Sequence, residues 1–122
     1  MLLALLLLVQ TGTAGPAPVY DGRAGQTNVR IPRQEAEIVV DGRLDEPAWA
    51  GAAVLTGFSQ YAPNDGIAAV DSTRVLAWYS PTAIHFGIMA YERHGAPTAT
   101  LADRDHIFGD DNIQILLGTF HD

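Results

Sequence analysis

The sequence predicts an all-β domain built mainly from antiparallel strands. Two adjacent segments, 72–79 and 83–92, show apolar and aromatic residues in alternation with period two, which is typical of half-buried strands. The short segment 80–82 between them has the length of a hairpin loop. A third alternating segment, 112–118, and a β-branched run at 38–40 supply further expected strands.

The N-terminus predicts an exported protein. Residues 2–9 form an unbroken apolar run, which is too short to span a bilayer but fits the core of a secretory leader. Small residues follow, so we expect a signal peptide at 1–14 with cleavage after Ala14, and Ala17 is a second candidate. No Lys or Arg precedes the run, which leaves a buried N-terminal strand or an uncleaved anchor as alternatives.

The domain itself is expected to begin near Glu35. The preceding segment, 15–34, mixes Gly, Pro and polar residues without periodicity, which is typical of an exposed linker. Residues 38–40 then form the first expected strand. Asp41-Gly42 ends this strand, because glycine accepts the positive φ of a tight turn.

A helical turn is expected around Trp49. Pro47 suits its first position because proline lacks an amide hydrogen. The carboxylates of Asp45 and Glu46 lie where side chains cap such a turn. Trp49 follows among alanines, which indicates a side chain packed against the sheet. A ligand platform is the alternative interpretation of this tryptophan.

The middle of the chain is expected to form an irregular strand and the hairpin. The irregular strand covers 54–61, and a turn follows at 63–66, where Asn, Asp and Gly tolerate tight geometry. In the hairpin, the more apolar face of the second strand is expected to point into the core; it holds Ile84, Phe86 and Ile88. The opposite face is expected to be covered at least in part; it holds Trp78, Met89 and Tyr91.

Composition excludes several classes of function. The chain has 122 residues, a formal net charge of −7 and no cysteine. An acidic domain has no electrostatic reason to bind nucleic acid or an anionic membrane surface. Without cysteine, neither a disulfide framework nor a thiolate metal site can form. The length has room for one domain, which its core alone must hold together.

The last expected strand, 112–118, has no successor with which to pair. An open set of strands leaves a long apolar edge, which native proteins avoid. We therefore expect residues 35–122 to be the N-terminal part of a longer domain. Missing strands supplied by a partner are the alternative.

Four segments in order resemble a known family: IVVDGRLDEPAW, GFSQYAPNDG, STRVLAWYSPTAIHFGIMAYE and GDDNIQILLGTFHD. Together they are similar to the family-nine carbohydrate-binding-like domain, in the version found at the N-terminus of bacterial outer-membrane proteins of domain-of-unknown-function family 5916. The resemblance covers about residues 37–122. It implies an antiparallel β-sandwich that is incomplete here at its C-terminus and that usually precedes a large β-barrel.

The resemblance also implies a binding site. In sugar-binding members, an aromatic side chain before the strand at 112–118 stacks on the sugar, and an acidic side chain inside that strand accepts hydroxyl hydrogen bonds. Phe108 falls at the aromatic position and Gln114 at the acidic one, where those members carry Trp and Glu. Asp111 adds a carboxylate beside them. The alternative is that Phe108 is an ordinary loop anchor that covers the end of the sandwich.

Other chemistries find less support in the sequence. We predict no cofactor. Calcium is the alternative, because this hard cation takes oxygen ligands from flexible loops. One loop is rich in aspartate and contains Asp103, Asp105, Asp110 and Asp111. These aspartates do not have EF-hand spacing, and the four histidines do not have zinc-site spacing. Glycosidase carboxylates, a nucleophile elbow and a phosphate-binding loop are not evident, so we predict no enzyme activity for this segment.

The sequence thus predicts a non-catalytic carbohydrate-binding module at the N-terminus of a longer exported protein. Its partner is a polysaccharide or oligosaccharide, and its location is the periplasm, the outer membrane or the cell surface. The longer protein could then serve carbohydrate catabolism. The competing prediction is a structural or interaction domain that packs on the downstream β-barrel of the same chain and binds no sugar. Fold class alone does not decide between them.

Overall fold

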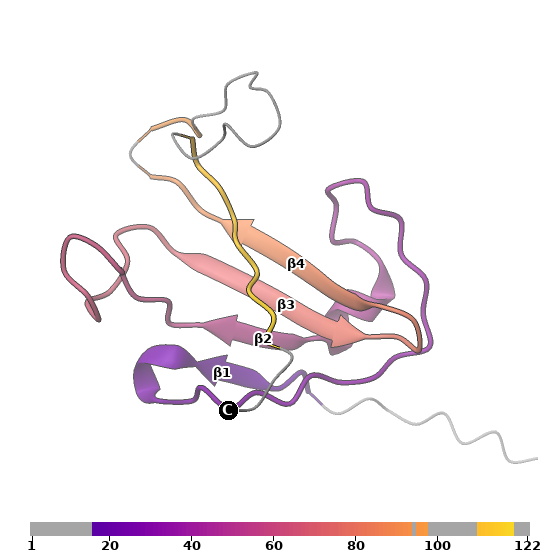
Figure 1. The fold of residues 1–122 in the computed structure, drawn as a ribbon. Helices are drawn as coiled ribbons and strands as arrows, with labels where there is room; N and C mark the ends of the chain where they lie inside the picture. Colours follow the sequence, from indigo (N-terminus) through magenta and orange to yellow (C-terminus); the bar gives the residue numbers. More distant parts are fainter. Residues whose placement is uncertain (1–15, 94, 98–109, 119–122) are drawn as a thin grey trace, which may run out of the picture. The chain divides into compact units, whose positions relative to one another are not determined.

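The computed structural model describes residues 16–93, 95–97 and 110–118 of the chain. Four strands form one mixed sheet in the order β1-β2-β3-β4, and two short 3₁₀ helices accompany it (Figure 1). The predicted all-β class is confirmed at the level of this sheet. The chain divides into two compact units, Met1–Tyr91 and Glu92–Asp122, and the sheet belongs to the first.

The central hairpin joins β3 (Thr73–Tyr79) to β4 (Ile84–Ala90), which are antiparallel. Its register runs from Thr73 opposite Ala90 to Tyr79 opposite Ile84. Ser80 closes the loop, because its amide donates to the Ala83 carbonyl at 2.8 Å and its hydroxyl accepts from the Ala83 amide at 3.1 Å. The hairpin predicted from the alternation is therefore confirmed.

The predicted linker at 15–34 instead contributes β1 (Val19–Asp21) and the 3₁₀ helix η1 (Gly22–Ala24). β1 pairs in parallel with β2 (Ala53–Thr56), and β2 pairs antiparallel with β3. The Asp21 carboxylate caps η1 by accepting from the amides of residues 23 and 24. A strand of three residues is too short to show period-two alternation, and its partner lies far along the chain. β1 could therefore not be predicted from the sequence pattern.

The strand expected at 38–40 does not form. Val39 is 70% exposed and Val40 is 95% exposed, and the backbone amide of Val39 donates to Glu46 Oε1 at 3.1 Å. β-Branched residues favour an extended backbone, but a strand also needs a partner for its backbone groups. Here the Glu46 carboxylate, and not a neighbouring strand, accepts the hydrogen bond from the Val39 amide.

The strand expected at 54–61 ends early, at Thr56. Gly57 follows with a φ of 69°, a left-handed conformation that turns the chain away from the ladder. Beyond it, an isolated bridge between Ser59 and Ala68 and a hydrogen bond from the Gly66 amide to the Gln60 carbonyl hold this loop across the expected turn. The turn at 63–66 is confirmed, and Gly66 in it has a φ of 77°.

The strand expected at 112–118, in the second unit, is also wrong as far as the structure describes it. None of residues 111–118 is assigned to a strand, and all of them are exposed. Alternation of Ile113, Ile115 and Leu117 marks one apolar side of an extended segment. No described segment pairs with residues 112–118, so their alternating pattern does not correspond to a paired strand there.

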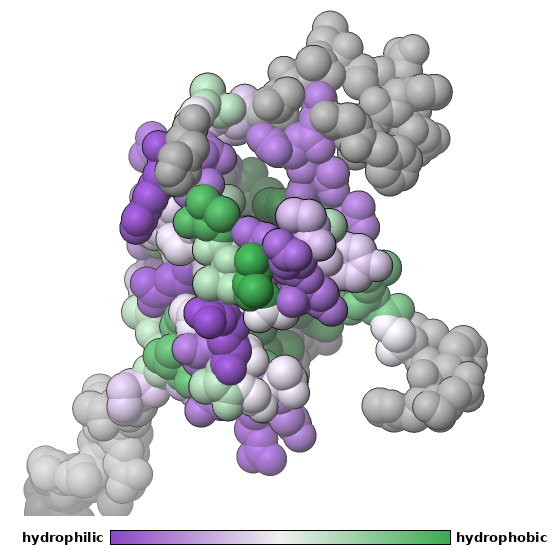
Figure 2. All heavy atoms as spheres, turned by 90° about the vertical axis from the view of Figure 1, so that its left-hand side faces the viewer, coloured by the Kyte–Doolittle hydropathy of each residue, from purple (hydrophilic) through white to green (hydrophobic). Residues whose placement is uncertain are grey.

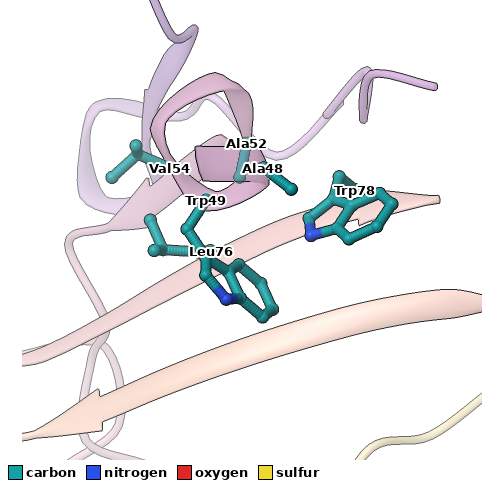
Figure 3. Close-up of a cluster of buried hydrophobic side chains, with 6 residues drawn as sticks. All are labelled: Ala48, Trp49, Ala52, Val54, Leu76 and Trp78. Atoms are coloured by element: carbon teal, nitrogen blue, oxygen red, sulfur yellow. The ribbon is translucent and has the colours of Figure 1, made fainter. Parts of the chain in front are cut away.

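The core lies on one face of the sheet (Figure 3). The 3₁₀ helix η2 (Pro47–Gly51) begins at proline, as predicted, and carries Trp49 onto this face. Trp49 is 6% exposed, which confirms its predicted packing role, and the core cluster contains Ala48, Trp49, Ala52, Val54, Leu76 and Trp78. Trp49 meets Trp78 edge to face, with centroids 6.0 Å apart and planes at 77°.

The predicted assignment of the two faces of the hairpin is therefore wrong. Trp78, on the face expected to be covered at least in part, is fully buried, whereas Ile84 and Phe86, which were expected to point into the core, are 51% and 40% exposed. The reason is that η2 packs its tryptophan on the Trp78 side, and large aromatic rings bury the most apolar area. We call the other side the open face; its members in the hairpin are Val75, Ala77, Tyr79, Ile84, Phe86 and Ile88, of which Ala77 is buried.

Candidate functional site

A groove of about 410 Å³ lies between β4 and the segment Ile38–Leu44, which bends at Asp41-Gly42, where Gly42 has a φ of 82°. We call it the β4 groove. The residues of β4 that line it are 86–89, and Trp49 contributes at its base. The opposite wall is strongly exposed and apolar at Val39 and Val40. The groove is therefore a hollow between a sheet edge and the segment that failed to become a strand.

Glu46 holds the outer wall of the groove in place. Its Oε1 accepts from the Val39 amide, and its Oε2 accepts from Trp49 Nε1 at 2.9 Å. The sequence predicted that Glu46 caps η2, and it does stand at the N-cap position, but its side chain makes no capping hydrogen bond. The carboxylate instead ties the extended segment to the buried indole.

Hydrogen bonds to its carboxylate lower the pKa of Glu46. Donation from its own backbone amide lowers the pKa of this carboxyl most, the Val39 amide lowers it further, partial burial opposes the shift, and the Trp49 indole adds a smaller lowering effect. The carboxylate therefore stays ionised at neutral pH. This charge strengthens the bonds that it accepts from both groups.

The base of the groove is closely packed against β4. A Cβ atom added at Gly87 would lie 2.8 Å from Leu44 Cδ2 and 3.1 Å from Trp49 Cζ3. Only a residue without a side chain allows Leu44 and Trp49 to approach the strand this closely. The indole of Trp49 is too buried to offer a stacking platform, so its edge serves as part of the floor.

The residues that the resemblance assigns to sugar binding lie in the second unit. Asp111 and Gln114 are exposed, as the prediction requires. Gln114 Nε2 donates to Asn112 Oδ1 at 3.1 Å, and Asn112 Nδ2 donates to the Asp110 carbonyl at 3.0 Å. Phe108 lies outside the described residues. We call Asn112 and Gln114, whose side-chain amides are joined, the polar row; Asp111 lies one residue before it in the sequence.

Asn112 was missed by sequence reasoning. Its position two residues before Gln114 in an extended segment is the signal that could have found it, because side chains two apart share a side. The pairing of the two amides orients both planar groups. It leaves the Gln114 carbonyl oxygen able to accept from a ligand hydroxyl.

A third surface, at the loop between β2 and β3, is apolar in places but not organised into a site. Its exposed large side chains are Phe58, Tyr61, Ile67 and Val70. Figure 2, which faces this end of the sheet, shows apolar residues scattered among polar ones. A scattered arrangement of this kind is ordinary for a protein surface.

Among the residues that the structure describes, there is neither a cluster of metal-ligating side chains nor a helix that could span a membrane. Within them, no group of three or more His, Asp or Glu residues could hold a metal ion. Asp103 and Asp105, which the calcium alternative needs, lie outside these residues, so that alternative stays untested. In the same part of the chain, no helix has the length and apolar character needed to cross a membrane.

Comparison of the chain with protein-family models, with curated proteins and with solved structures finds no match. The resemblance to the family-nine domain therefore stays a prediction from the sequence. The fold of the first unit and the geometry of the groove and of the polar row are independent of it.

Proposed function

We propose that this chain is a non-catalytic carbohydrate-binding module of a longer exported envelope protein, and that its sheet is one layer of a β-sandwich. The observation that carries the proposal is the polar row, whose side chains are exposed and whose two amides are joined by a hydrogen bond. The resemblance of the sequence to the family-nine domain supports the same ligand class at the same segment.

The polar row has the chemistry that sugar hydroxyls require. Sugar sites combine a flat apolar face with planar polar groups that fix the hydroxyls. The Gln114 carbonyl oxygen supplies a neutral acceptor, and Asp111 is the carboxylate that the sequence predicts beside it. Phe108 is the aromatic side chain that the resemblance assigns to the C–H face of the sugar.

A panel of soluble oligosaccharides, titrated into the full chain, tests this proposal by calorimetry and by amide chemical shifts. We expect saturable heat, together with shifts at residues 111–114, and both should vanish in Phe108→Ala. Phe58→Ala is the matched control, because Phe58 is a 41% exposed phenylalanine in the other unit. Silence across the panel, or equal losses in both variants, contradicts sugar binding.

A gain of affinity offers a second arm of the same experiment. Gln114→Glu restores the acidic acceptor that the resemblance implies at this position. The variant loses the neutral hydrogen bond that Gln114 Nε2 donates to Asn112, but a charged acceptor makes stronger bonds than a neutral one, so affinity should still rise by about fivefold. Gln60→Glu, a change of the same charge in the first unit, should leave the affinity unchanged.

A second candidate function, a structural or interaction domain without a sugar ligand, is favoured by the open face. Ile84, Phe86 and Tyr79 expose between 37% and 51% of their surface there. A sheet that is apolar on both faces normally packs against a further layer. In this reading, the layer comes from the downstream part of the longer protein or from a partner.

Hydrogen exchange with and without the region downstream of Asp122 tests the second candidate. We expect the hairpin to gain protection only when that region is present. Phe86→Ser should remove the gain, whereas Tyr61→Ser, at a loop position that is 91% exposed, should not. Equal protection in the short and long chains would rule the candidate out.

A further inference from the structure

We propose that the β4 groove binds an extended peptide from another protein, which adds to the sheet beside β4 and carries basic residues at its ends. This interaction is separate from sugar binding, because every residue that forms the groove belongs to the first unit. Four observations carry it: the free backbone of β4, the shape of the groove, the composition of the edge and the charge around it.

The outer backbone of β4 is available for pairing. The Tyr91 amide donates to Ser72 at 2.9 Å and the Ser80 amide donates to Ala83, which fixes the phase of the hairpin ladder. Backbone groups alternate in direction along an antiparallel strand. Phe86 and Ile88 therefore direct their N–H and C=O groups away from β3, and no described residue bonds to them. An unpaired edge of this kind is a template for an added strand.

The groove has the form that an added strand needs. One side is the β4 edge and the other is the exposed apolar wall at Val39 and Val40, so alternate side chains of a peptide would meet apolar surface. Glu46 fixes that wall through the Val39 amide, and the packing of Leu44 against Gly87 fixes the base. A site that is already in place loses little entropy when a ligand binds.

The composition of β4 does not protect this edge. Native sheets block their edges with proline, lysine or inward-pointing charges. From Ile84 to Ala90 the strand contains no proline, lysine, arginine, aspartate or glutamate. The edge that limits the sheet is thus chemically open to pairing over its full length.

Charge decides which strand is accepted. The chain has a net charge of −7, which disfavours the association of two copies. Asp41 and Arg43, the charged residues that line the groove, balance each other, and the negative charge comes from three carboxylates that flank these residues in the sequence: Glu37, Asp45 and Glu46. A peptide with lysine or arginine at its ends meets complementary charge there, which favours it over a second copy of this chain.

The probe is a synthetic peptide in which three valines alternate with threonines between pairs of lysines. Titrated into the full chain, it should shift the amides of Phe86 and Ile88 and slow their hydrogen exchange, while the inward amides of Gly87 and Met89 change less. Replacement of the lysines by glutamates should weaken binding by about tenfold at low salt. Shifts confined to other residues, or equal affinity of the two peptides, would overturn the proposal.

Two pairs of variants localise the effect. Ile88→Pro removes one outward N–H and leaves the β3 ladder intact, so peptide affinity should fall by about fivefold to tenfold. Ile88→Val keeps the N–H and should change affinity by less than about twofold. Val40→Asn on the groove wall should weaken binding, whereas Val70→Asn, away from the groove, should not.

Two further outcomes would replace this occupant by another. A dimer in sedimentation experiments, with exchange protection at Phe86 and Ile88 before peptide is added, would assign the edge to a second copy. The same protection in a monomer would assign it to the chain itself. Because the oligosaccharide panel reads out at residues 111–114, failure of either proposal leaves the other intact.

Discussion

Glu46 shows how a single residue joins local chemistry to the shape of a surface. Its carboxylate accepts from Val39 and from Trp49, so it connects an exposed segment to the core. The partner at Val39 could not be predicted from the sequence, because the amide is available only where the expected strand fails to pair. The burial of Trp49 could be predicted, since a tryptophan among alanines has few other roles.

The role of Glu46 predicts a pH dependence. Its pKa in the folded chain lies below the ordinary value of 4.5, so its contribution to stability is complete above that value and is lost as the pH falls through the folded pKa. The difference in melting temperature between the wild type and Glu46→Gln should therefore shrink between about pH 6 and about pH 3. Thermal unfolding at a series of pH values measures it. A difference that is constant across this range would show that the carboxylate charge has no role.

The two core tryptophans predict a contrast between equal substitutions. Trp49 Nε1 donates to Glu46, whereas Trp78 Nε1 is buried with no acceptor in the described part of the chain. A buried donor without a partner costs about 1–3 kcal/mol, and Trp78→Phe removes that cost. Trp78→Phe should therefore destabilise the chain less than Trp49→Phe, although Trp78 is the more buried. Urea unfolding followed by circular dichroism decides the order, and a larger loss for Trp78→Phe would contradict it.

At the scale of the polar row, the sequence predicted the exposure of Asp111 and Gln114 but not their organisation. Exposure follows from the polar residue types, although Gln114 was expected inside a strand, whereas the hydrogen bond from Gln114 to Asn112 was not predicted. The spacing of two residues between Asn112 and Gln114 is the sequence signal from which this pairing could have been predicted. Phe108, the third predicted site residue, lies outside the described residues, so the aromatic half of the site stays a prediction.

Among the strands, the hairpin was predicted correctly, β2 was predicted with a C-terminal end that lies too far along the chain, and β1 was not predicted. The hairpin is encoded locally, by alternation on both sides of a three-residue loop. β1 depends on a partner far along the chain, and residues 38–40 and 112–118 lack a strand partner in the described structure. Alternation predicts an extended backbone, but pairing is a property of the whole sheet.

The end of β2 supplies a prediction at this scale. Gly57 has a φ of 69°, and a Cβ atom added there would overlap Asp21 Oδ1, the group that caps η1. Gly66 has a similar φ of 77° but open space around it. Gly66→Ala should cost about 1–2 kcal/mol for the left-handed backbone alone. Gly57→Ala should cost clearly more, because it also displaces the cap, and chemical denaturation compares the two. Equal losses would mean that the cap contributes nothing.

For the molecule as a whole, hydropathy identified the sheet but chose the wrong inner face. The face of Ile84 and Phe86 is the more apolar by composition, yet the core forms on the side of Trp78. The inner face of the sheet is determined by η2, which brings a second tryptophan to the side of Trp78, and a small core forms there. A prediction from one hairpin cannot contain this information, since both of its faces are apolar.

The position of β1 predicts the effect of shortening the chain. A chain that starts at Glu35, the boundary expected from the sequence, loses the bond from the Val54 amide to the Pro18 carbonyl and the bond from Thr56 Oγ1 to the Tyr20 carbonyl. β2 would then become an edge strand. We expect a lower melting temperature, by several degrees, than for a chain that starts at Gly15. Equal melting temperatures for the two chains would show that β1 adds no stability.

The parallel pairing of β1 with β2 also sets an order of events during synthesis. Val19 leaves the ribosome well before its partner Val54, about 35 residues later. Pairing across such a separation is slow compared with closure of the neighbouring hairpin. If the leader acts as proposed, the first strand crosses the membrane alone. β1 then stays unpaired until β2, its partner in the sheet, has followed it.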